Sequence, residues 1–192
     1  MTKRHKETTF LELLEPHRRS LYRFCRNIIW DKNDVEDALQ TAILSAYKSF
    51  DTFQKGGNFK AWIFKFLVNT VYNFNKKHGR KDTFETRLDC DEPGILEVFE
   101  KESMYQEILK DPDRLLERVD ERVKRSLFRL SLSERAVFLL RSIEGLSYKE
   151  ISEVLQIPVG TVMSQLSRAR AKLREFLCDY AKEIGFFADR ND

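Results

Sequence analysis

Apolar residues recur at intervals of three and four along most of the chain. No stretch alternates with period two for long enough to predict a strand. The helical spacing predicts a first helix over roughly residues 9–29 and a second over about 34–50, with Asn33 as the N-cap of the second. The Gly-containing break at 54–57 precedes a third helix within residues 58–81, NFKAWIFKFLVNTVYNFNKKHGRK.

Helical spacing resumes near Arg114 and predicts further helices over about 133–143, 147–155 and 160–183. The segment Ser147-Tyr-Lys-Glu150 has the form of a capping box, which marks a helix start. A short helix followed, after a tight turn, by a long basic helix is typical of a helix-turn-helix motif. The sequence therefore predicts an all-α protein whose C-terminal part carries that motif.

Charge is unevenly distributed along the 192 residues, although the formal net charge is only +3. The segment from Asp82 to Glu121 contains 14 acidic and five basic residues. We expect two small helical domains, residues 1–82 and 114–184, joined by an acidic linker at 83–113 and followed by a tail at 185–192. The two basic parts indicate a polyanionic partner such as nucleic acid.

Several classes of protein are disfavoured by the composition. No apolar run reaches the roughly 20 residues that span a bilayer, and the polar N-terminus has no signal-peptide core, so a cytoplasmic protein without membrane insertion is expected. Three cysteines at distant positions suggest neither disulfides nor a metal site, and no cofactor is expected. The chain lacks a nucleophile elbow and a Gly-rich phosphate loop, so an enzyme is not expected.

The predicted helix at 58–81 has two distinct faces. A broad arc is apolar and forms a core face. The opposite, narrow arc combines rings, amides and cations, which together can hold unstacked bases and phosphates. This arc consists of Trp62, Lys65, Asn69, Tyr72, Asn73 and Lys76.

The long C-terminal helix also divides into two faces. Val162, Leu166, Ala169 and Leu173 form the apolar face. The remaining surface offers short hydrogen-bonding groups and a guanidinium suited to the edges and phosphates of a major groove, with cations on the flank that position the DNA backbone. These candidate residues are Thr161, Met163, Ser164, Gln165, Ser167, Arg168, Arg170 and Lys172.

Two long stretches resemble one protein family. The sequence LSERAVFLLRSIEGLSYKEISEVLQIPVGTVMSQLSRARAKLREFL (132–177) resembles region four of the extracytoplasmic-function sigma factors, the small two-domain initiation subunits of bacterial RNA polymerase. The sequences DVEDALQTAILSAYKSF (34–50) and FKAWIFKFLVNTVYNFNKK (59–77) are similar to region two of the same family. The matches follow one another in the family's order.

This resemblance implies an alternative sigma factor that directs core RNA polymerase to promoters and assists in melting them. Its partners would be core polymerase, duplex and single-stranded promoter DNA, and an anti-sigma factor. Asp37 and Gln40 fit the family's Asp-x-x-Gln polymerase-binding motif, and Leu44 lies on the same predicted helix face. The expected minus-ten residues are Asn58 and Phe59 of a specificity-type loop, the narrow arc listed above, and Lys77.

Departures from the family pattern bear on promoter choice. Met163 and Gln165 stand where basic residues are frequent, which predicts weak minus-thirty-five binding by the isolated C-terminal domain. Gln156 stands where a turn glycine is common. A stand-alone helix-turn-helix regulator is the alternative interpretation, although it leaves the Asp37 face and the 58–81 helix unexplained.

Overall fold

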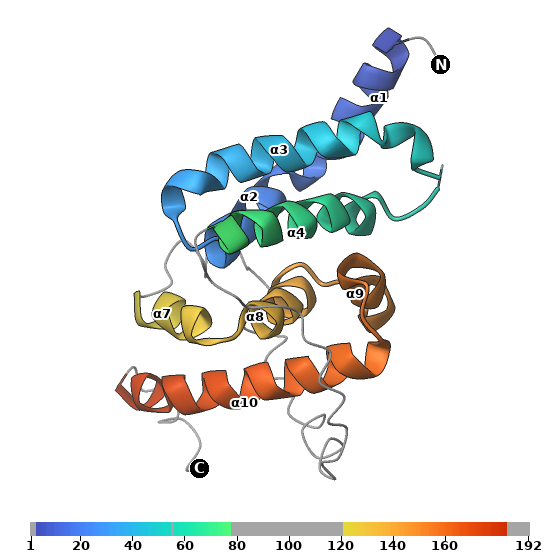
Figure 1. Cartoon of the computed structure of the whole chain (residues 1–192). Coiled ribbons are helices and arrows are strands. Elements are labelled where there is room, and N and C mark those ends of the chain that lie inside the picture. Colours follow the sequence, from blue (N-terminus) through green and yellow to red (C-terminus); the bar gives the residue numbers. More distant parts are fainter. Residues whose placement is uncertain (1–2, 55, 78–120, 184–192) are drawn as a thin grey trace, which may run out of the picture. The chain divides into compact units, whose positions relative to one another are not determined.

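The computed structural model describes residues 3–54, 56–77 and 121–183, and every regular element in these ranges is helical (Figure 1). This confirms the predicted all-α class. The expected linker and tail lie outside the described residues. None of the described helices has the length and apolarity needed to cross a bilayer. The chain divides into two compact units, Met1–Thr83 with Leu146–Val159 and Phe84–Gly145 with Gly160–Asp192.

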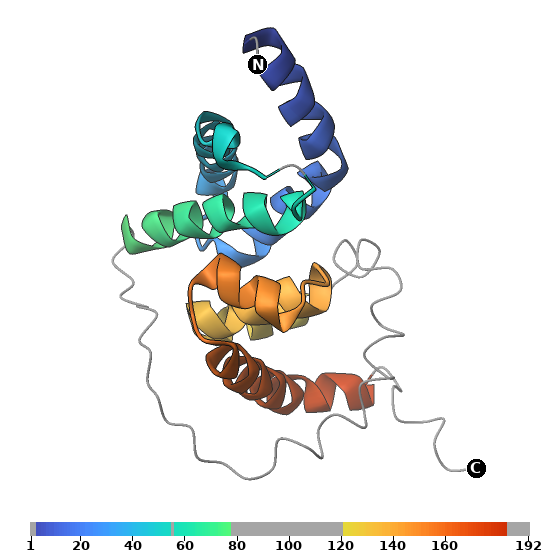
Figure 2. The same cartoon turned by 90° about the vertical axis from the view of Figure 1, so that its right-hand side faces the viewer.

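The predicted first helix is two helices. α1 (Lys3–Leu14) and α2 (Arg18–Ile28) are separated by a 3-10 turn, η1 (Glu15–His17). Pro16 in this turn has no backbone N–H to continue an α-helical ladder, which explains why a single helix over 9–29 was wrong. In Figure 2, α1 leads away from α2 at an angle.

The second and third predicted helices are present with different starts. η2 (Lys32–Asp34) leads into α3 (Val35–Lys48), and the Asp31 side chain accepts a hydrogen bond from the Asn33 backbone N–H. Asp31 therefore caps η2, whereas the N-cap of α3 is Asp34, which makes no side-chain capping bond; the predicted Asn33 cap was wrong. α3 ends at η3 (Phe50–Thr52), and α4 (Phe59–Lys77) follows the loop.

The core of the first unit is formed where α4 packs on α3 and α2, as Figure 1 shows. Fully buried side chains from these helices include Phe24, Ala38 and Phe64. Cys25 is buried among them, and this burial raises the pKa of its thiol to about 12. The thiol is therefore protonated and unreactive at neutral pH.

One buried amide fastens α4 to the end of α2. Asn75 is only 7% exposed; its Oδ1 accepts from the Trp30 backbone N–H at 3.2 Å, and its Nδ2 donates to the Ile28 carbonyl at 3.3 Å. These bonds satisfy backbone groups that the end of α2 leaves open. Asn75 is thus a structural residue, unlike the exposed Asn69 and Asn73 of the same helix.

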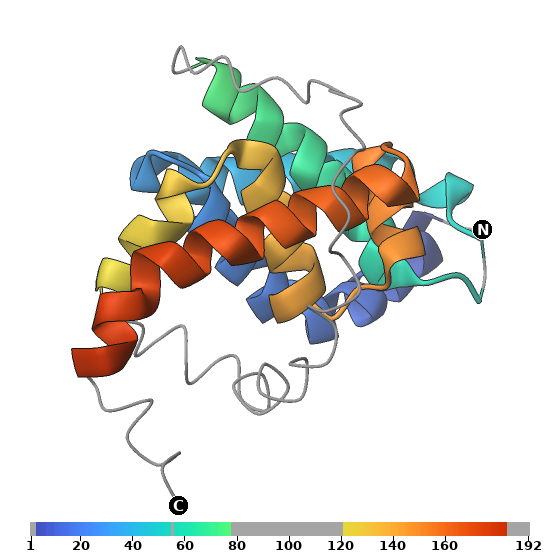
Figure 3. The same cartoon turned by 90° about the horizontal axis from the view of Figure 1, so that it is seen from below.

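The second unit is built from α7 (Glu121–Arg129), α8 (Leu132–Phe138), the π-helical segment η5 (Leu139–Ile143) and α10 (Val159–Glu183). The helix predicted over 133–143 therefore changes its pitch at Leu139. Figure 3 shows α10 as one long helix alongside α7 and α8. The core of the second unit includes a cluster that joins α7 to α10, formed by Leu127, Leu130, Ala169 and Leu173.

The turn of the helix-turn-helix follows α9 (Tyr148–Leu155). Ser147 and Glu150 form the predicted capping box at the start of α9. At its end, Gln156 adopts the left-handed conformation with φ 56° and ψ 42°. Ile157 N–H donates to the Ser152 carbonyl at 3.2 Å, which closes the turn before α10. This left-handed position gives a physical reason for the turn glycine that the resemblance implies here.

We expect Gln156→Gly to stabilise the protein. A left-handed L-residue costs about 1–2 kcal/mol, and glycine removes that cost at an unfolded-state entropy penalty of about 0.5–1 kcal/mol. The expected gain is about 0.5–1 kcal/mol, measured as a higher midpoint in urea unfolding. Gln156→Ala removes the side chain but keeps the constraint, so it should give no gain. A loss of stability in Gln156→Gly would contradict the argument.

Candidate nucleic-acid and polymerase-binding surfaces

The outer face of α3 carries the predicted polymerase-binding residues. Asp37, Gln40 and Leu44 are all exposed, and Leu44 is 58% exposed, more than any other large hydrophobic side chain of the described residues. The opposite face of α3 is buried through Ala38 and Ala42. The spacing of three, four and seven residues thus places a solvent-facing leucine beside a carboxylate and an amide.

The narrow arc of α4 is exposed in part. Asn69, Asn73 and Lys76 are exposed, whereas Lys65 and Tyr72 are half-buried. The side chain of Lys77 lies outside the described residues. The structure therefore brings two amides and a cation to the surface along the C-terminal half of α4.

Trp62 and Phe59 belong to an aromatic cluster that sequence reasoning missed. The Trp62 ring centroid lies 5.3 Å from that of Phe53, 5.6 Å from that of Phe59 and 4.8 Å from that of Phe66. Phe59 also packs edge-on against Phe10 of α1 at 6.0 Å and is only 6% exposed. Phe59 is consequently a core residue in this structure, and Trp62 combines packing with partial exposure. The five phenylalanines between residues 50 and 66 were the available signal.

Asn58 has two polar contacts in the first unit. Its Oδ1 accepts from the Ala61 backbone N–H at 3.1 Å, so Asn58 caps α4. Its Nδ2 donates to Oε1 of Glu150. The pKa of the Glu150 carboxyl is lowered, chiefly because Ser147 donates side-chain and backbone hydrogen bonds to it, with a smaller contribution from Asn58. Both ends of the Asn58 amide are therefore occupied in this structure.

The predicted faces of α10 are largely recovered. Val162, Leu166, Ala169 and Leu173 are buried, as predicted. Arg168 is exposed, and Met163, Ser164, Ser167 and Arg170 are half-buried. Thr161 and Gln165, at 9% and 5% exposure, are buried instead. The Gln165 side-chain oxygen has no hydrogen-bond partner among the described residues, so the predicted base-reading role of Gln165 requires a rearrangement.

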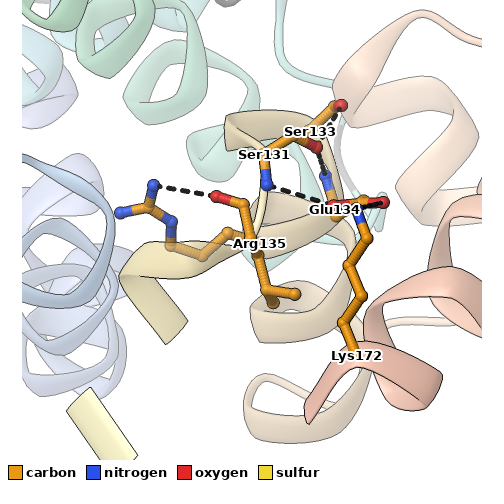
Figure 4. A network of polar contacts seen from close by, with 6 residues as sticks. Ser131, Ser133, Glu134, Arg135 and Lys172 are labelled. Atoms are coloured by element: carbon orange, nitrogen blue, oxygen red, sulfur yellow. Dashed lines mark hydrogen bonds and ion pairs between the residues drawn. The ribbon is translucent and has the colours of Figure 1, made fainter. Parts of the chain in front are cut away.

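Lys172 is held by an internal ion pair. Its Nζ lies 2.8 Å from Oε1 and 2.9 Å from Oε2 of Glu134, at the N-terminus of α8 (Figure 4). The Glu134 side chain is only 7% exposed. Oε2 of Glu134 also accepts from the Ser131 N–H at 3.0 Å, and Glu134 N–H donates to Ser131 Oγ at 3.3 Å. The predicted contact of Lys172 with the DNA backbone would therefore have to compete with this ion pair.

Comparison with known proteins gives consistent matches in both parts of the chain. The family models described as "Sigma-70 region 2" and "Sigma-70, region 4" match residues 13–81 and 120–173. The chain is 36% identical over 141 residues to the ECF RNA polymerase sigma-E factor of Escherichia coli strain K12, covering 71% of this chain and 70% of that protein. The chain belongs to the extracytoplasmic-function subfamily of the sigma-70 family. It is an alternative sigma factor of transcription initiation.

Other relatives support the same assignment for this sigma factor. ECF RNA polymerase sigma factor SigW of Bacillus subtilis strain 168 is 28% identical over 183 residues, covering 92% of this chain and 93% of that protein. In fold, the sigma factor is similar to RpoE of Bartonella quintana, which was solved in complex with the anti-sigma factor NepR. The TM-score is 0.62 and the sequence identity is 23%, and the match covers 89% of this chain and 95% of that chain. The region-two match disfavours the stand-alone regulator interpretation.

The pKa of the Glu134 carboxyl in this sigma factor is lowered. Burial of the side chain raises it, but the hydrogen bond and charge of Lys172 and the bonds from Ser131 outweigh that effect. Because the folded-state pKa lies below the unfolded value, the carboxylate contributes stability above the unfolded pKa of about 4.5. That contribution is lost as the pH falls through the folded-state pKa.

We expect Glu134→Gln to cost about 1–2 kcal/mol of stability at pH 7, because it removes a capping carboxylate and a charged partner of Lys172. The cost should shrink as the pH falls below 4.5, where the wild-type carboxyl becomes protonated. Urea unfolding from pH 7 to pH 3 measures this difference. Glu175→Gln, at an exposed carboxylate of α10, serves as the control and should cost less than about 0.5 kcal/mol at pH 7. A cost independent of pH would refute the role of the charge.

Proposed function

We propose that the two described surfaces of the first unit act in sequence during initiation: the outer face of α3 docks on core polymerase, and the exposed stripe of α4 holds the opened minus-ten strand. The observation that supports this proposal most directly is that Asn69, Asn73 and Lys76 of the narrow arc are exposed, whereas the other face of α4 is packed in the core. A helix anchored in this way presents its polar groups without reorganisation.

Strand opening needs a compensating interaction on the protein. Unstacking a base costs a few kcal/mol, whereas stacking on an aromatic side chain returns about 1–3 kcal/mol per base. Trp62 and Tyr72 are half-buried and leave part of each side chain at the surface. Lys65 and Lys76 supply charges for phosphates. The aromatic cluster packs against the Trp62 ring and restricts its rotamers, so less side-chain conformational entropy is lost when a base binds.

For duplex recognition we propose the N-terminal half of α10, with Arg168 as the exposed charged group and Ser164 and Ser167 beside it. The small number of exposed cations there suggests modest minus-thirty-five affinity outside the holoenzyme. The protein would act in the cytoplasm, where its polymerase is. The solved relative RpoE, bound to the anti-sigma factor NepR, supports proposing a regulator of that kind for this chain. CnrH, a second solved protein of similar fold, is in complex with the cytosolic domain of CnrY.

The polymerase-docking proposal is tested by two matched leucines. Leu44 of α3 and Leu11 of α1 are 58% and 52% exposed, so truncating either should change the free energy of unfolding by less than about 0.5 kcal/mol. Leu44→Ala should weaken binding to core polymerase about tenfold, as expected of an interface anchor of about 1–2 kcal/mol. Leu11→Ala should bind normally. Equal affinities in a fluorescence titration would contradict the docking role of Leu44.

The minus-ten proposal is tested with exposed asparagines. The double variant Asn69→Ala/Asn73→Ala should reduce the fraction of melted promoter about tenfold, because bases lose edge contacts with α4. Permanganate reactivity of unpaired thymines, with holoenzyme on an in vitro selected promoter, measures melting. Asn33→Ala, an exposed asparagine of η2, is the control. Core-polymerase affinity should not change in either variant. Normal promoter melting by the double variant would contradict the proposed role of Asn69 and Asn73.

A further inference from the structure

The Glu134 carboxylate makes all of its described polar contacts within the second unit. It caps α8 through Ser131, and both of its oxygens face the Lys172 ammonium at 2.8 and 2.9 Å (Figure 4). With 7% of the Glu134 side chain exposed, departure of Lys172 would leave a largely buried carboxylate without its counter-charge. Lys172 is 44% exposed, so its ammonium can reach solvent but is drawn toward Glu134.

The ion pair lies beside the apolar contact between α7 and α10. Leu173, the next residue after Lys172, packs with Leu127 and Leu130. Apolar burial is non-directional, so this leucine cluster constrains the rotation and register of α10 less specifically than a hydrogen-bonded ion pair does. A two-oxygen ion pair to the capped first turn of α8 adds a directional constraint at the same level of α10.

We propose that Lys172 is a positioning residue, whose ion pair with Glu134 fixes the rotation and axial register of α10 and thereby the presentation of Arg168 and Ser164 to duplex DNA. This proposal rests on the proposed duplex-reading role of α10. At 1.5 Å per residue, Arg168 lies about 6 Å and Ser164 about 12 Å along the helix from Lys172. A small rotation at the ion pair therefore displaces the groups that reach the groove.

The competing assignment, Lys172 as a direct phosphate contact, predicts the opposite behaviour of Glu134. If Lys172 bound phosphate, removal of the Glu134 charge would release the ammonium and strengthen DNA binding or leave it unchanged. If Lys172 positions α10, removal of either partner should weaken binding by a similar factor. Removal of both should weaken it no further, since the two side chains act as one unit.

The experiment measures binding of the full chain to a duplex selected by the wild-type chain from a random pool, at several salt concentrations. We expect Glu134→Gln and Lys172→Met each to weaken binding about tenfold, the double variant to match the single ones, and Lys172→Arg to restore binding. The slope of log affinity against log salt should stay within about 0.3 of wild type in all of them. Arg168→Gln is the contrasting variant and should lower the slope by about 0.9, the loss of one phosphate contact.

Tight binding by Glu134→Gln, or a slope loss of about 0.9 in Lys172→Met, would overturn the positioning role, as would unchanged binding in both. Circular dichroism at the assay temperature reports whether each variant is folded. Should Glu134→Gln not fold, the salt slope of Lys172→Met still decides the matter: weaker binding at an unchanged slope fits a positioning role, and a slope loss of about 0.9 fits a lost phosphate contact. An unchanged slope in Arg168→Gln would instead count against the proposed reading face of α10, which separates the two failures.

Discussion

Burial of one face of α4 against α2 and α3 is the constraint on which the rest of the first unit depends. A helix of 19 residues is marginal in isolation, and each large apolar side chain that it buries contributes about 1.5–3 kcal/mol. Phe64, Leu67 and Val71 are essentially inaccessible to solvent. Because the helix is held by this face, the polar groups on the other face need contribute nothing to folding. They are therefore available for the proposed contact with DNA.

Polar side chains at helix ends make many of the remaining stabilising contacts. Asn58, Ser131 and Ser147 each cap a helix, and the two serines do so in reciprocal capping boxes with a glutamate. These glutamates then serve a second partner: Glu150 accepts from Asn58, and Glu134 binds Lys172. Short helices with small cores gain stability and direction from such shared carboxylates, since one acid satisfies a backbone donor and a distant side chain together: the Asn58 amide for Glu150 and the Lys172 ammonium for the buried Glu134.

The sequence predicted the helices that periodicity and caps define, and it failed where tertiary contacts decide. The buried stripe of α10 and the Ser147 capping box were correct because spacing alone specifies them. Pro16 was an available signal for the break between α1 and α2, but the continuous apolar spacing around it masked that signal. The burial of Phe59 and Gln165 and the pairing of Lys172 depend on neighbours distant in sequence, which no local pattern reveals.

Cations of one helix can therefore have different roles even when they look equivalent in sequence. Arg168 and Lys172 are one turn apart and lie near one another on α10. Arg168 is exposed, whereas Lys172 faces a buried carboxylate that would be left uncompensated without it. A Lys172 ammonium that moved to a phosphate would gain one charge contact at the surface and lose a partly desolvated one, which is the stronger of the two. The energetics thus favour Arg168 as the residue that contacts DNA, and Lys172 as the residue that positions α10.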